Sequence, residues 1–296
     1  MSRAWLLVSV GLVVLALATA GCSRKSDAST PGDGQPAARI VATADFGADD
    51  LLTARVAPGG SVMDGLRSVT AVETAYGGGF VASMLGRGTE TAPAADWFFY
   101  VNGIESPVGA GDVTLTDGEV AWWDHHRWQG AMSIRGVVGS WPEPFVHVAP
   151  TVQADAPLAA PLRAAGAKVA ARASTFRVLV GTDATLSSRD ATWRSIAGDP
   201  GGRHLAGGIA NGAVVLIPPG GGPPVPVTGA SAVAVLVPVG TKAADGAVFA
   251  VAGLTPAAAR AAAATIARDP AVLAQRFAVA FNATGVPVQS AGRAEA

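Results

Sequence analysis

The sequence predicts an α+β fold, in which a domain with one helix on a mixed sheet is followed by a separate α/β domain. Between residues 40 and 130, apolar runs of strand length surround a single segment with helical spacing. From residue 145 to 296, strand-like and helix-like segments alternate over short connections, a pattern typical of an α/β layer. Glycines and the segment Pro142-Glu143-Pro144 mark the boundary between the two parts.

The first domain is expected to begin near Ile40 and to contain strands on both sides of its helix. Strands are predicted from Leu51 to Val56 and from Phe80 to Leu85. Between them, Ser61 and Asp64 have the spacing of a capping box, in which each side chain accepts a hydrogen bond from the other's backbone. Apolar residues then recur at helical spacing and predict one buried helix face: Val62, Met63, Leu66 and Val69.

The stretch from Asp96 to Trp128 holds four of the seven Trp residues and two adjacent histidines. Two turn signals, Asn102-Gly103 and Asp117-Gly118, lie next to apolar runs of strand length. Tight turns between strands require positive φ, which Gly adopts without steric cost and Asn or Asp tolerates better than most residues. This stretch is therefore predicted to supply strands joined by tight turns.

Both faces of the predicted sheet carry aromatic side chains. Because side chains alternate along a strand, Trp122 and Trp123 are expected to point to opposite faces. One face packs on the helix, so the other must be covered by the following domain or by a ligand. The residues expected at a ligand are Trp97, Phe99, Tyr100, Asn102, Trp122, Trp123, His125 and His126.

The run Asp124-His125-His126 contains side chains of the types that bind zinc. Two adjacent residues of a strand point in opposite directions, so His125 and His126 could share one ion only if the strand ended or bulged between them. We therefore expect no metal site and partly exposed polar residues at a strand end. Trp and His side chains here would also suit a planar or sugar-like ligand.

The second domain is expected to begin with a parallel strand pair joined by a helix. The predicted segments are a strand at Val146 to Val152, a helix at Ala156 to Ala165, a strand at Phe176 to Val180, a short helix at Ala191 to Ala197, and strands at Val214 to Ile217, Val233 to Val237 and Val248 to Ala252. Thr255 and Pro256 predict the start of a helix that runs to Arg268. Asp269-Pro270 repeats this start signal and predicts a second helix, or a kink, through about Ala280.

The first residues predict export. An uncharged run from Ala4 to Gly21 ends at the only cysteine, Cys22, and the preceding small residues resemble a bacterial lipobox. Residues 1–22 are therefore expected to be a lipoprotein signal peptide, residues 23–39 a flexible linker, and Cys22 the lipidated anchor on the outer face of the cell membrane. A transmembrane helix is the alternative, because the run nearly reaches the length of a span.

Charge and motifs exclude several classes of function. The formal net charge of −1, with acidic and basic residues interspersed, provides no electrostatic footprint for nucleic acid. The chain lacks a nucleophile elbow, a dinucleotide-binding glycine motif, a Walker loop and a zinc-protease helix motif. We therefore expect no enzyme, no catalytic residue and no cofactor.

Residues 40–130 contain a spaced pattern of Trp, Gly and turn residues, which comprises Trp97, Val101-Asn102-Gly103, Gly109, Gly111, Leu115, Asp117-Gly118-Glu119-Val120 and Trp122. With this pattern the region resembles the β-grasp-like domain at the C-terminus of transcobalamin and intrinsic factor. Glu119 departs from it, since Asp is commoner at that place. The resemblance implies a domain that binds a soluble ligand, and it supplies no catalytic residues. Cobalamin is only one candidate ligand, because nothing in this sequence matches the helical barrel of the vitamin carriers.

The lipoprotein signal and the domain resemblance together predict a lipid-anchored extracytoplasmic protein that binds a small soluble ligand, cobalamin or another. Such a protein would be linked to uptake, with a transporter as a further partner. The alternative is a structural or interaction module of the cell envelope without a small ligand. The role of the α/β domain at residues 145–296 is left open.

Overall fold

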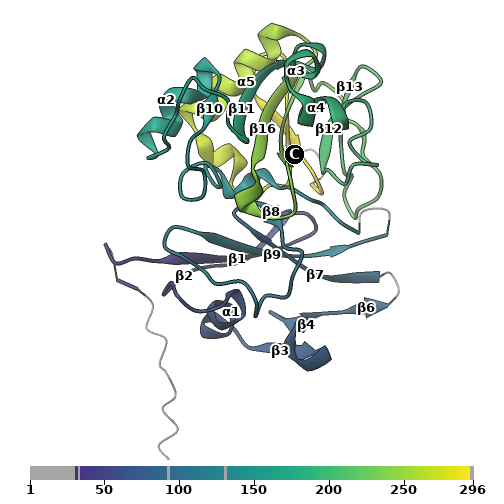
Figure 1. The fold of residues 1–296 in the computed structure, drawn as a ribbon. Helices are drawn as coiled ribbons and strands as arrows, with labels where there is room; N and C mark the ends of the chain where they lie inside the picture. The colour runs from purple at the N-terminus through teal and green to yellow at the C-terminus, as the bar shows by residue number, and fades with distance from the viewer. Residues whose placement is uncertain (1–30, 33, 92–93, 130–131, 294–296) are drawn as a thin grey trace, which may run out of the picture.

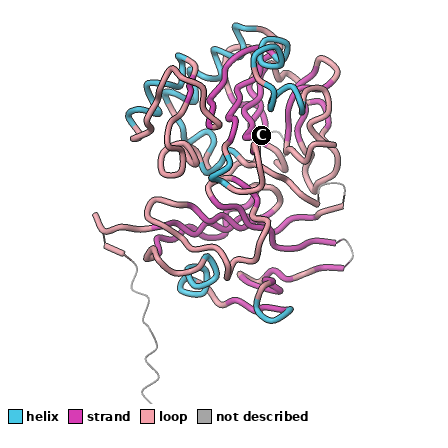
Figure 2. Tube along the Cα trace, in the orientation of Figure 1, coloured by secondary structure: helices cyan, strands magenta, loops and turns pink. Residues whose placement is uncertain are grey.

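The computed structural model describes residues 31–32, 34–91, 94–129 and 132–293, which form an α+β protein of two domains with few helices and several sheets (Figures 1 and 2). The predicted fold class is confirmed. Cys22 and the rest of the predicted signal peptide lie outside the described residues. In the part of the chain that is described, no helix has both the length and the apolar character needed to cross a membrane.

The N-terminal domain is built on a mixed sheet with the strand order β2-β1-β9-β7-β6. The short strand β8 also pairs with β7, at the opposite end of that strand from β6. Its strands are β1 (Ala38–Ala44), β2 (Asp49–Val56), β6 (Glu90–Thr91), β7 (Ala94–Val101), β8 (Ile104–Glu105) and β9 (Val120–Arg127). The central pair β1 and β9 is parallel, whereas β2 and β7 run antiparallel to their neighbours. The turn between β7 and β8 lies at Asn102 and Gly103, both with positive φ, as predicted.

One face of this sheet is covered by α1 (Val62–Val69) and by a small sheet of β3 (Val72–Ala75), β4 (Phe80–Met84) and β5 (Arg87–Gly88) (Figure 1). The predicted capping box is present, because the Ser61 hydroxyl accepts from the Asp64 N–H and the Asp64 carboxylate accepts from the Ser61 N–H. Apolar side chains from this layer and the sheet form one core, which includes Ile40, Leu66 and Trp123.

The second domain is built on the sheet β10-β11-β16-β15-β17-β18. These strands are β10 (Gln153–Ala154), β11 (Phe176–Thr182), β15 (Ala232–Pro238), β16 (Ala247–Gly253), β17 (Val279–Phe281) and β18 (Pro287–Ser290). The strands β10, β11 and β16 are parallel, as the predicted strand–helix–strand pattern requires.

Both faces of the second sheet are covered. The helices α2 (Ala156–Ala164) and α5 (Pro256–Arg268) pack on one face. The helices α3 (Asp183–Arg189) and α4 (Ala191–Ile196) pack on the other, together with the small sheet of β12 (Gly207–Ala210), β13 (Ala213–Leu216) and β14 (Val225–Pro226). Thr255 caps α5 by accepting from the Ala258 N–H at 3.1 Å, as its position before Pro256 predicts.

Two predictions for the second domain are wrong, and the helix α3 was not predicted at all. Where a strand was predicted at Val146 to Val152, residues 146–148 form a turn and the strand begins only at Gln153. After Pro270 the chain forms a single 3-10 turn, Pro270–Leu273, and then the strand β17, where a helix through Ala280 was expected. Pairing of β17 with β15 overrides the local helical pattern, because it buries Phe281 in the core of this domain.

The two domains share a core. Val41, Tyr100, Val120 and Trp122, from the face of the N-terminal sheet opposite α1, belong to the same buried cluster as the α3–α4 side of the second domain. Figure 1 shows the N-terminal sheet between α1 with β3 and β4 below and the second domain above. The Trp122 ring packs edge-on against Phe277 at 5.2 Å. The following domain therefore covers this sheet face, which settles the alternative that the sequence left open.

A loop between β1 and β2 holds the domains together. The backbone N–H groups of Phe46 and Gly47 donate to the buried Asp124 carboxylate at 3.1 and 2.9 Å. On its other side, the carbonyl groups of this loop accept hydrogen bonds from the second domain. Arg276 donates to the Gly47 carbonyl at 2.9 Å, and Arg293 donates to the Ala48 carbonyl. Charge-assisted hydrogen bonds of this kind are among the stronger ones in proteins.

Replacing Gly139 by Ala should destabilise the contact between the domains. A Cβ there would lie 2.6 Å from the Arg276 N and 2.7 Å from Trp122 Cζ3, and neither the backbone nor the buried ring can move away freely. We expect a loss of about 2 kcal/mol in the free energy of unfolding, the usual size for overpacking. Gly111→Ala is the control, since its Cβ meets nothing within 4 Å. Chemical denaturation measures both, and equal stabilities of the two variants would contradict this packing.

Candidate functional site

The sequence-predicted site residues separate into two groups because they lie on opposite faces of the N-terminal sheet. Tyr100 and Trp122 face the second domain and are fully buried, and Tyr100 packs edge-on against Phe277 at 5.4 Å. Asn102 is also buried, and its amide bonds Glu119 and the Val120 N–H. These three residues therefore stabilise the interface and the β7–β8 turn in this structure.

The two histidines are buried rather than partly exposed, which corrects the sequence prediction. His126 faces the second domain between Phe46 and Phe98, whose rings stack on it at 4.4 Å each, and its Nδ1 lies 2.7 Å from Asp124 Oδ1. His125 points to the opposite face, where its Nε2 lies 2.9 Å from the Gly88 carbonyl oxygen. Residues packed on both faces exclude solvent from β9 as far as His126, and only its last residue, Arg127, is exposed.

Trp97, Phe99 and Trp123 line a groove at the outer edge of β7. The groove has a volume of about 360 Å³, within the usual range of small-molecule sites. It forms where β7 lacks a neighbouring strand, because β6 pairs only with Ala94 and Ala95 and β8 pairs only with Tyr100 and Val101. The walls come from β4, β7, β9, the segment after β8, and two residues that follow β9, Trp128 and Met132.

The aromatic walls of this groove are held in place by neighbouring groups. Phe99 stacks on Trp123 with ring centroids 4.8 Å apart. The Trp97 indole N–H donates to the Arg87 carbonyl at 3.2 Å, and the Trp128 indole N–H donates to Asp96 Oδ2 at 2.9 Å. The Trp123 Nε1 is buried and has no hydrogen-bond partner among the described residues. A buried donor without a partner is costly, so a ligand acceptor at this wall would be stabilised.

Two carboxylates lie in the groove wall. Asp96 accepts from Trp128 through one oxygen, whereas its Oδ1 is buried and has no partner among the described residues. Glu105 accepts from the Ser133 hydroxyl. Burial raises the pKa of the Glu105 carboxyl, and the Ser133 hydrogen bond opposes this shift.

Sequence reasoning missed Asp96, Glu105 and Trp128 as groove residues. Trp128 and Asp96 stood at the ends of the aromatic stretch, but nothing local indicated that they pair with each other. Glu105 follows the Asn102-Gly103 turn, and only the return of the chain along β8 places it beside Tyr100. Asp96 pairs with Trp128, and Glu105 pairs with Ser133, through contacts between distant segments that periodicity along one strand does not predict.

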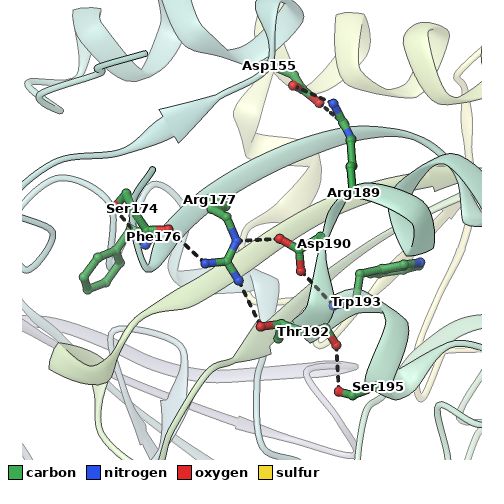
Figure 3. Close-up of polar contacts among 9 residues, drawn as sticks. All are labelled: Asp155, Ser174, Phe176, Arg177, Arg189, Asp190, Thr192, Trp193 and Ser195. Atoms are coloured by element: carbon green, nitrogen blue, oxygen red, sulfur yellow. Dashed lines mark hydrogen bonds and ion pairs between the residues drawn. The ribbon is translucent and has the colours of Figure 1, made fainter. Parts of the chain in front are cut away.

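A second polar cluster lies in the second domain and is saturated by its own contacts (Figure 3). Arg177 donates to Asp190, to the Ser174 carbonyl and to the Thr192 hydroxyl, while the other Asp190 oxygen accepts from the Trp193 N–H. These bonds tie β11 to α4. The cluster is therefore interpreted as structural support that fixes α4 on β11.

No group of three His, Cys, Asp or Glu side chains that could hold a metal ion occurs among the described residues. Strand alternation directs the rings of the two adjacent histidines, His125 and His126, to opposite faces of the sheet, as predicted.

Comparison with known proteins finds a family model that matches part of this chain. Residues 59–127 match a family described as a domain of unknown function, DUF4430. The match falls within the N-terminal domain and includes most of the groove residues. No curated protein matches the chain.

Among solved structures, the chain is similar to a protein from Ruminococcus gnavus ATCC 29149 that is provisionally described as metal binding. The identity is 9%, the TM-score is 0.27, and the alignment covers 31% of this chain and 98% of that one. A likeness this weak supports no conclusion about the function of this protein.

Replacing Glu105 by Gln should change how stability depends on pH. Because the folded-state pKa of Glu105 is raised, the folded protein holds this proton more tightly than the unfolded chain does. Its contribution is present below the ordinary pKa of 4.5 and is lost as the pH rises through the higher folded-state value. As the pH rises above 4.5, wild type should therefore lose stability relative to Glu105→Gln in urea denaturation. Glu90→Gln, at an exposed position, is the control, and parallel curves for wild type and Glu105→Gln would contradict the raised pKa.

Proposed function

We propose that this protein is a lipid-anchored extracytoplasmic binding protein and that the groove beside β7 holds its small ligand. The observation that carries the proposal is the groove itself, a cavity of about 360 Å³ walled by Trp97, Phe99, Trp123 and Trp128. Apolar and aromatic walls with a few polar groups are typical of sites that bind small molecules. Binding without catalysis is the role we propose.

The groove suits a ligand with one flat or apolar part and at least one hydrogen-bond acceptor. Aromatic walls favour stacking and apolar contact, and the unpartnered Trp123 N–H favours an acceptor oxygen or nitrogen. A whole corrinoid is far larger than this cavity, so cobalamin could place only an edge or a side group in it. Cobalamin, smaller planar molecules and sugars are therefore the candidates, and delivery to a transporter is the proposed use of binding.

The second candidate function is a cell-envelope interaction module, and the open edge of β7 favours it. From Asp96 to Phe99, β7 has a strand neighbour on one side only. An extended segment of a partner protein could pair with such an edge by strand addition. Such a partner would occupy the same groove, so the ligand screen below separates the two functions.

Screening small molecules against the full-length chain in a nonionic detergent tests the first function. We expect one compound class among cobalamin, tetrapyrroles and sugars, or an organic cation, to raise the melting temperature. Phe99→Ala should weaken its binding about tenfold, since one aromatic contact contributes about 1 kcal/mol beyond the area it buries. Trp141→Phe is the control, because Trp141 packs against Phe249 in the second domain, away from the groove. Binding that is unaffected by Phe99→Ala would place the ligand elsewhere.

Replacing Cys22 by Ser tests the proposed anchor. A diacylated cysteine holds a protein stably at the membrane, because each buried CH₂ contributes about 0.8 kcal/mol. We expect the variant to lose incorporation of labelled palmitate and to move from the membrane fraction to the soluble fraction. Tight membrane attachment of Cys22→Ser would contradict the lipoprotein prediction and favour a transmembrane helix.

A further inference from the structure

The lining of the groove beside β7 contains acidic and aromatic side chains but no basic ones. It contains six aromatic residues, two carboxylates and one thioether, and none of its lining residues is Lys, Arg or His. The aromatic members are Phe80, Trp97, Phe98, Phe99, Trp123 and Trp128. Aromatic faces carry negative potential, and a cation within about 6 Å of a ring centroid is attracted to it.

The rings are fixed before any ligand arrives. The indole N–H groups of Trp97 and Trp128 are engaged by Arg87 and Asp96, and Phe99 and Trp123 stack on each other. Rings that are already held lose little side-chain entropy when a ligand binds. The walls are thus preorganised for a ligand of complementary charge.

The two carboxylates make the cavity a poor environment for an anion and a favourable one for a cation. Asp96 presents an oxygen that is buried and unpartnered among the described residues. Such an oxygen is costly to bury and would gain from a positive partner. Glu105 lies at the same wall and is partly desolvated, which strengthens its interaction with a nearby charge.

The cationic side chains nearest Glu105 do not neutralise the groove. Arg135 donates to the Gly240 carbonyl at 2.8 Å and lines a separate cavity on the other side of Glu105. His126 lies between two phenylalanine rings, and His204 lines a further cavity with Ser133. None of these three cationic residues lines the groove, and Asp96 Oδ1, which has no partner among the described residues, is left for a ligand.

We propose that the groove selects an organic ammonium cation, which the aromatic rings surround and which Asp96 and Glu105 balance in charge. This inference rests on the proposed function, because it names the chemical class of the ligand for the same groove. It predicts discrimination by charge between molecules of the same shape.

Choline and 3,3-dimethyl-1-butanol test this discrimination, since they have nearly the same shape and differ in charge. With the full-length chain in a nonionic detergent, calorimetry should show choline binding at least tenfold more tightly than the alcohol. Asp96→Asn and Glu105→Gln should each weaken choline binding severalfold and leave the alcohol unaffected. Asp112→Asn, at an exposed aspartate outside the groove lining, is the matched control and should change neither.

Equal affinities for the two probes, absence of choline binding, or choline binding that survives both carboxylate substitutions would overturn the inference. Thermal melting of each variant without ligand checks that it is folded. The same experiments distinguish failure of the cation inference from failure of the proposed function. If a neutral compound binds and is lost with Phe99→Ala while choline does not compete, the groove is a ligand site and only the cation inference is wrong. If no compound binds in a way that depends on Phe99, the proposed function itself is wrong.

Discussion

The buried carboxylate of Asp124 is the interaction on which the arrangement of the two domains depends. It accepts from the Thr43 hydroxyl, from the N–H groups of Phe46 and Gly47, and pairs with His126. Burying a charge without partners would cost several kcal/mol, so these donors are required. In return, the carboxylate holds residues 45–47 in the left-handed region, a conformation that only Gly adopts without strain. That loop then presents its carbonyl groups to the second domain.

The strand β9, which supplies Asp124, also carries aromatic residues on both of its faces, and the two sets have different roles. On one face of β9, Val120, Trp122 and His126 complete the core shared with the second domain. On the other face, Trp123 belongs to the core under α1 and reaches the groove at the edge of β7. Docking of the second domain thus uses one face entirely and leaves the open edge of β7 as the place where a ligand can reach the aromatic residues. The function we propose for the groove follows from this division.

Several features could be predicted because neighbouring residues decide them. The capping box at Ser61 and Asp64, the Asn102-Gly103 turn, the start of α5 at Thr255 and Pro256, and the opposite directions of Trp122 and Trp123 all depend on local geometry. The helix expected through Ala280 is wrong for the converse reason, because a distant segment decides its conformation. Its pattern is locally helical, but pairing with β15 contributes more than helix propensity, whose differences are fractions of a kcal/mol per residue.

By itself, the sequence determined the fold class, the order of most elements and the face to which each aromatic side chain points. Only the tertiary structure decided what covers each face and which residues meet at the edge of β7. Asp96, Glu105 and Trp128 lie on three separate segments, and their positions depend on the β7–β8 turn and on the contact between β7 and the residue after β9. Spacing along the chain specifies the direction of a side chain, whereas its neighbours come from contacts between distant segments.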